Sequence, residues 1–78
     1  MAMTAQEQVD RNYEWFIANL ESLMPRYGGM WVLLKDCAVV EMCNSINEGY
    51  RRGVEKYGVG NFSVQKCVNP QPVIKIYG

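Results

Sequence analysis

The stretch Met30-Trp31-Val32-Leu33-Leu34-Lys35-Asp36-Cys37-Ala38-Val39-Val40-Glu41-Met42-Cys43 decides the fold of this protein. It contains two apolar runs separated at Asp36-Cys37, a pattern that predicts two β-strands joined by a very short reversal. A two-stranded ribbon is marginally stable in water by itself. We therefore expect the remaining elements of the chain to cover this hairpin.

Pairing around Asp36-Cys37 places Leu34 opposite Val39 and Val32 opposite Glu41. Because side chains alternate along a strand, each face of the ribbon can be listed from this register. One face has Trp31, Leu33, Lys35, Ala38, Val40 and Met42, and the other has Met30, Val32, Leu34, Val39, Glu41 and Cys43. Neither face is polar, whereas a small two-layer domain normally covers only one face of its sheet. We expect an open apolar face formed by Met30, Val32, Leu34 and Val39.

A helix is predicted before the hairpin. Thr4 and Glu7 have the spacing of a capping box, which marks a helix start. Apolar residues then recur at intervals of three and four, at Val9, Tyr13, Phe16, Ile17, Leu20, Leu23 and Met24. Pro25 disfavours helical geometry at Met24, so we expect the helix to end there. Trp15 lies outside the apolar stripe, so it is either exposed and active in recognition, or covered because the helix is wrapped further or the C-terminal segment lies over it.

A second helix is predicted after the hairpin. Ser45 and Glu48 form another capping box, and Gly58 is suited to the helix end. The apolar stripe of this helix consists of Ile46, Tyr50, Val54 and Tyr57. Gly49 and Gly53 lie on or beside the stripe, and we interpret them as small residues that let the helix approach the sheet closely.

Two further strands complete the pattern, at residues 62–67 and 73–77, separated by Pro70 and Pro72. The order is helix, strand, strand, helix, strand, strand, which predicts one α+β domain over residues 1–78. We expect a two-layer sandwich in which both helices cover one face of an antiparallel sheet.

Composition excludes several function classes. Eight basic and eight acidic residues cancel, so no global field attracts the chain to nucleic acid or membrane. No apolar run is long enough to span a bilayer, and residues 1–4 do not resemble a signal peptide. Histidine is absent, and the three cysteines, Cys37, Cys43 and Cys67, lack metal-site spacing. We expect a reduced, cytoplasmic protein with unpaired thiols and no metal or cofactor.

The residues also resemble a known family. The matching motifs are Tyr27-Gly28-Gly29-x-Trp31-Val32, Val39-Val40, Ser45-x-x-Glu48 and Tyr57-Gly58-x-Gly60-Asn61-Phe62-x-Val64. They resemble a small bacterial family catalogued as a domain of unknown function, over about residues 20–76. The resemblance implies a leading helix, a short hairpin, a second helix and a terminal strand region, and it implies no activity. Family members often have a glycine in the hairpin turn, so Asp36-Cys37 also permits a four-residue loop over residues 35–38 with the same faces.

Two side chains are candidates for catalytic groups, Glu41 and Cys43. Glu41 lies inside an apolar strand, and in a pocket its pKa would rise, as a proton donor requires. Cys43 precedes the second helix, where a thiol can be activated. The simpler explanations are a carboxylate that meets water and a buried small apolar residue. The sequence therefore predicts no catalytic site and no small-molecule substrate.

The leading hypothesis is a non-enzymatic protein-interaction module that self-associates or binds and regulates another protein. It rests on the expected open face and on Trp15, because exposed apolar patches and tryptophans mark binding surfaces. Domains of this size also include antitoxins and phage-encoded inhibitors, so an inhibitory role belongs to this hypothesis. The alternative is nucleic-acid binding through the outer side of the second helix. Its basic side chains, Arg51, Arg52 and Lys56, would contact the phosphate backbone of the nucleic acid.

Overall fold

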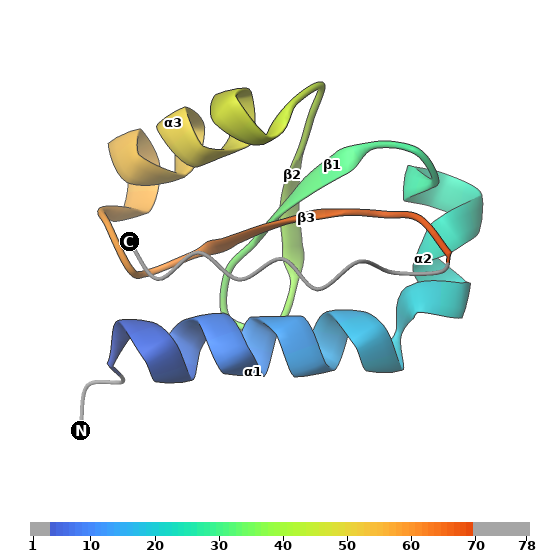
Figure 1. Cartoon of the computed structure of the whole chain (residues 1–78), viewed down its shortest axis with the longest axis horizontal. Helices are drawn as coiled ribbons and strands as arrows, with labels where there is room; N and C mark the ends of the chain where they lie inside the picture. Colours follow the sequence, from blue (N-terminus) through green and yellow to red (C-terminus); the bar gives the residue numbers. More distant parts are fainter. Residues whose placement is uncertain (1–3, 70–78) are drawn as a thin grey trace.

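The computed structural model describes residues 4–69, which form an α+β fold with three helices and one antiparallel sheet of three strands. The elements are α1 (Ala5–Ala18), α2 (Leu20–Tyr27), β1 (Trp31–Leu34), β2 (Val39–Cys43), α3 (Ile46–Tyr57) and β3 (Ser63–Lys66), as Figure 1 shows. The α+β class predicted from the sequence is confirmed. The strand expected at residues 73–77 lies outside the described residues.

The hairpin lies at the centre of the fold because β1 is the middle strand, in the order β2-β1-β3. Val32, Leu33 and Leu34 are each 0% exposed. These consecutive residues point to alternate faces, so both faces of β1 are covered. A continuous apolar run is typical of such a strand.

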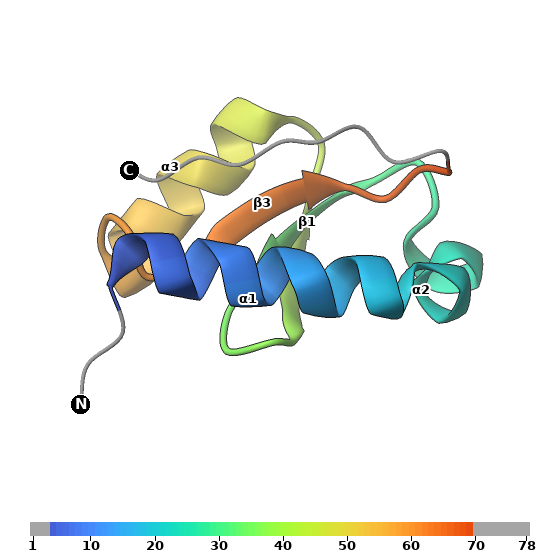
Figure 2. The ribbon, with the colours of Figure 1, turned by 60° about the horizontal axis from the view of Figure 1, so that its bottom comes forward.

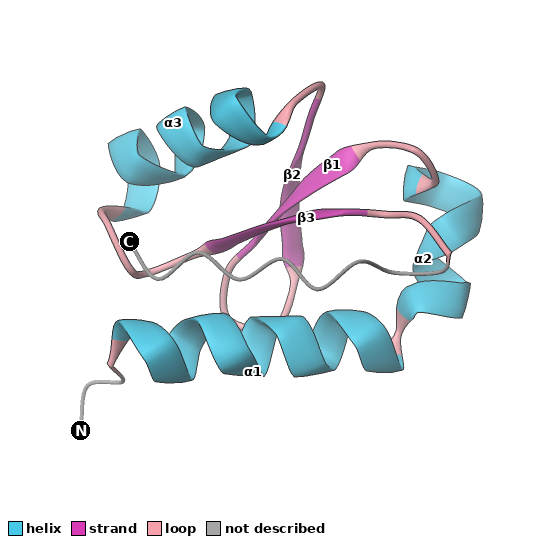
Figure 3. Ribbon diagram, viewed as in Figure 1, coloured by secondary structure: helices cyan, strands magenta, loops and turns pink. Residues whose placement is uncertain are grey.

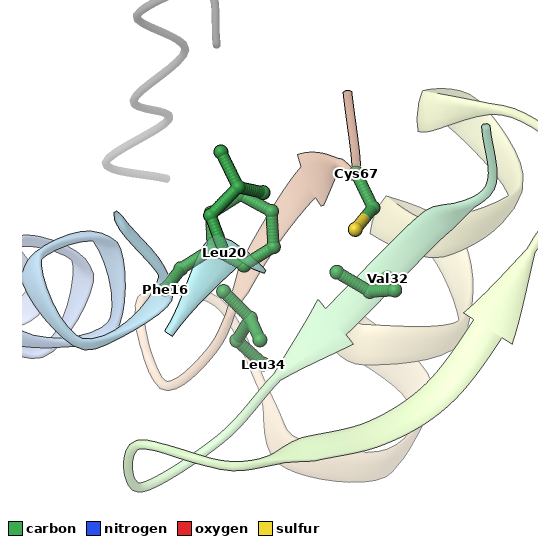
Figure 4. Packing of buried hydrophobic residues seen from close by; sticks show 5 residues of the cluster. All are labelled: Phe16, Leu20, Val32, Leu34 and Cys67. Atoms are coloured by element: carbon green, nitrogen blue, oxygen red, sulfur yellow. The ribbon is translucent and has the colours of Figure 1, made fainter. Parts of the chain in front are cut away.

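Two apolar clusters occupy opposite faces of the sheet. On one face α1 and α2 contribute to the first cluster, which consists of Phe16, Leu20, Val32, Leu34 and Cys67 (Figure 4). On the other face α3 packs against the second cluster, Leu33, Phe62 and Val64. Figures 1 and 3 show the strands between α1 and α3. The expectation that both helices cover one face is therefore wrong, because β1 has apolar side chains on both faces and each face needs a helix.

The hairpin has the predicted two-residue turn but not the predicted register. Asp36 and Cys37 both have positive φ, 51° and 57°, as a type I′ turn requires. Val39 lies opposite Leu34, as expected, but the register then shifts by one residue. Such an irregularity is a β-bulge, in which one strand contains an extra residue.

The bulge reverses the faces of the residues that follow it. Glu41 lies opposite Leu33, and Met42 lies opposite Val32. Glu41 therefore shares the α3 face and Met42 the α1 face. The predicted pairing of Val32 with Glu41 is wrong, because an alternation counted from the turn omits the extra residue.

The first predicted helix is divided into α1 and α2 at Asn19, whose side-chain amide donates to the Trp15 carbonyl at 2.8 Å. α2 continues through Pro25 to Tyr27, so the expected end at Met24 is wrong. Proline removes one backbone donor, but the helix still closes after it, because the Gly28 N–H donates to the Met24 carbonyl at 2.8 Å.

The residues predicted to begin and end α3 are confirmed. The Ser45 hydroxyl accepts from the Glu48 N–H at 3.1 Å, and Gly58 ends the helix with φ +82°. Gly53 lies against Phe62 so closely that an added Cβ would be 2.4 Å from the ring. The interpretation that small residues let this helix approach the sheet is confirmed.

Candidate functional site

The open apolar face predicted from the sequence is wrong in its central part. Val32 and Leu34 are fully buried beneath α1 and α2, whereas Met30 and Val39 are half-buried. The reason is the opposite placement of the helices, which puts this face of β1 under the first cluster. An interaction surface on this side must therefore be built from residues around the cluster.

The helices cover the two faces of the sheet unequally. α3 packs against all three strands, whereas the main strand contact of α1 is with β3, along which it runs in Figure 2. In the described residues β2 is an edge strand. Within residues 4–69, the α1-side face of β2 therefore has less helix cover than its α3-side face.

Two side chains of β2 belong to that poorly covered face. Val39 and Met42 lie opposite Leu34 and Val32, and paired residues share a face. Val39 packs against the first cluster and is half-buried, whereas Met42 is 47% exposed. Val40, at the bulge between them, is 43% exposed. An apolar edge strand is thus partly open to solvent.

Trp15, on α1, packs against the first cluster. It is half-buried and packs against the same cluster as Val39, so of the two alternatives the structure supports partial burial. The Cys37 N–H donates to the Asn12 side chain at 2.9 Å, and the Cys37 thiol contacts the Arg11 carbonyl at 3.7 Å. These contacts place the middle of α1 beside the hairpin turn, and Trp15 lies one helical turn beyond Arg11 along α1. We call Trp15, Val39 and Met42 together the β2 surface.

The opposite face of β2 carries an ion-pair network with α3. The Glu41 carboxylate pairs with Arg52 at 2.9 Å and with Lys56 at 3.2 Å, and Arg52 also pairs with Glu48 at 3.2 Å. The hydrogen bond from Lys56, aided by the positive charges of Lys56 and Arg52, lowers the pKa of Glu41. A proton donor would need a raised pKa, so this geometry does not favour acid catalysis.

The network also bears on the nucleic-acid hypothesis. Arg52 and Lys56 are engaged by carboxylates of the chain itself, whereas Arg51 is exposed. A phosphate would have to compete with Glu41 for two of the three predicted contacts. The arrangement therefore favours a structural role for Arg52 and Lys56.

Cys37, Cys43 and Cys67 are free cysteines in this structure. Burial raises the pKa of the Cys43 and Cys67 thiols, which keeps them protonated and weakly nucleophilic. Within residues 4–69 no group of three His, Cys, Asp or Glu side chains could hold a metal ion. None of the helices in this range has the length and apolar character needed to cross a bilayer.

Two hollows lie away from the β2 surface residues. The larger has a volume of about 670 Å³ and includes Glu21 and Ser22 in its wall, and the smaller, about 300 Å³, lies at Ile46 and Tyr50. The Ser22 hydroxyl donates to the Asn19 carbonyl at 2.9 Å, so it is not paired with a base. This geometry does not activate a nucleophile.

Sequence reasoning missed Met42 as a surface residue of the α1 side and Asn12 as a buried one. Met42 was assigned to the other face because the bulge has no signal in the apolar pattern. Asn12 is 0% exposed and contacts three separate parts of the chain. The sequence around Asn12 shows only a polar residue beside the apolar stripe, and this pattern does not predict its buried hydrogen bonds.

Comparisons with protein-family models, with curated proteins and with solved structures find no match to this chain. The resemblance to a bacterial family of unknown function stays a prediction.

Proposed function

We propose that this protein is a non-enzymatic interaction domain that binds a protein partner through the β2 surface. One observation carries the proposal: Met42, on a strand that lies at the edge of the sheet formed by residues 4–69, exposes 47% of its surface. An apolar side chain gains free energy when a partner removes it from water. Single exposed apolar residues are common on protein surfaces, so the other residues on this side of the sheet also matter.

Trp15 and Val39 are residue types found in binding surfaces. Trp15 and Val39 are half-buried against the same cluster, so their accessible atoms are held in place by a rigid core. Tryptophan is enriched among residues that dominate binding energy, and methionine adapts its shape to a partner. Preorganised apolar side chains lose little conformational entropy on binding, which favours association.

The remaining chemistry supports a binding role in a reducing compartment such as the cytoplasm. Cys37, Cys43 and Cys67 are unpaired, which is the usual state of cysteines there. The ion-paired Glu41 and the protonated buried thiols supply no activated acid, base or nucleophile.

Photo-crosslinking in cells that make this protein tests the proposal. A photoreactive amino acid replaces Met42 in one variant and Val59 in a control variant, because Val59 is similarly exposed, at 54%, but is not part of the β2 surface. We expect a discrete protein adduct from position 42 and none from position 59. Equal labelling from both positions, or none from position 42, would contradict the proposal.

A further inference from the structure

We draw no further inference here: the strongest candidate, the apolar hollow of about 300 Å³ at Ile46 and Tyr50 on α3, carries nothing because nothing in the part of the chain that the structure describes shows what covers it.

Discussion

At the scale of single residues, the buried side chain of Asn12 joins α1 to the hairpin and to β3 by hydrogen bonds. Its side-chain oxygen accepts from the Cys37 N–H at 2.9 Å. Its amide group donates to the Leu34 carbonyl at 3.4 Å and to the Ser63 hydroxyl at 3.3 Å. One buried side chain of α1 therefore holds both the hairpin turn and β3. The turn needs such support, because positive φ at two non-glycine residues costs about 1–2 kcal/mol each.

Replacing Asn12 should reveal this role. Asn12→Ala removes all three contacts and leaves the Cys37 N–H without its acceptor, so we expect the free energy of unfolding to fall by about 2–3 kcal/mol. Asn47→Ala is the matched control, because Asn47 is an exposed asparagine of a helix, and its effect should stay within about 0.5 kcal/mol. Urea denaturation measures both. Equal effects of the two substitutions would mean that the buried contacts are not stabilising.

At the scale of elements, the close approach of α3 to β3 is a property of Gly53 and Phe62 together. The helix propensity of alanine exceeds that of glycine by about 1 kcal/mol. However, a Cβ at Gly53 would lie 2.4 Å from the Phe62 ring. Overpacking a core costs about 1–3 kcal/mol. Gly53→Ala should therefore destabilise the protein, although it improves helix propensity.

A double-mutant cycle with Phe62→Leu isolates the contact, since the smaller side chain makes room for the new methyl group. We expect the double variant to be more stable than the sum of the single effects predicts. Additive losses in chemical denaturation would show that the steric contact with Phe62 is not the cause.

The ion pairs between β2 and α3 make stability depend on pH. The pKa of Glu41 is lowered from 4.5 in the folded protein, by its hydrogen bond with Lys56 and by the charges of Lys56 and Arg52. A lowered pKa in the folded state means that the carboxylate adds stability above the unfolded-state pKa and loses it as pH falls through the folded-state pKa. Glu41→Gln should therefore be less stable than the wild type near neutral pH, and the difference should shrink below pH 4.5.

Denaturation of both proteins from about pH 7 to about pH 3 measures this difference. Glu55→Gln serves as the control, because Glu55 is an exposed glutamate of α3 outside the Glu41 network. A Glu41→Gln effect that is constant over the range would contradict the expected linkage.

At the scale of the whole molecule, stability rests on two small clusters and on no covalent link between the cysteines. Oxidation should therefore leave the melting temperature within about 2 °C of its value in reductant, whereas a new bridge adds about 2–4 kcal/mol. Melting curves with and without reductant measure this, and Cys37→Ser, which removes the half-buried thiol, controls for bridges between molecules. A large stabilisation on oxidation would show that two thiols reach each other.

The sequence by itself determined the local elements of this protein. The capping residues Thr4 and Ser45 begin α1 and α3, Gly58 ends α3, and the two-residue turn lies at Asp36-Cys37. These features depend on interactions within a few residues of the chain, so local patterns reveal them.

Only the tertiary structure decided which side of the hairpin each helix covers and which residues remain accessible. Both faces of β1 are apolar, so hydrophobic alternation could not tell a covered face from an open one. The bulge in β2 then moved Glu41 to the α3 face and Met42 to the α1 face, because one extra residue reverses the alternation of every residue after it. The burial of Asn12 has the same kind of cause, since its partners Cys37 and Ser63 are distant in sequence and meet it only when α1, the turn and β3 pack together.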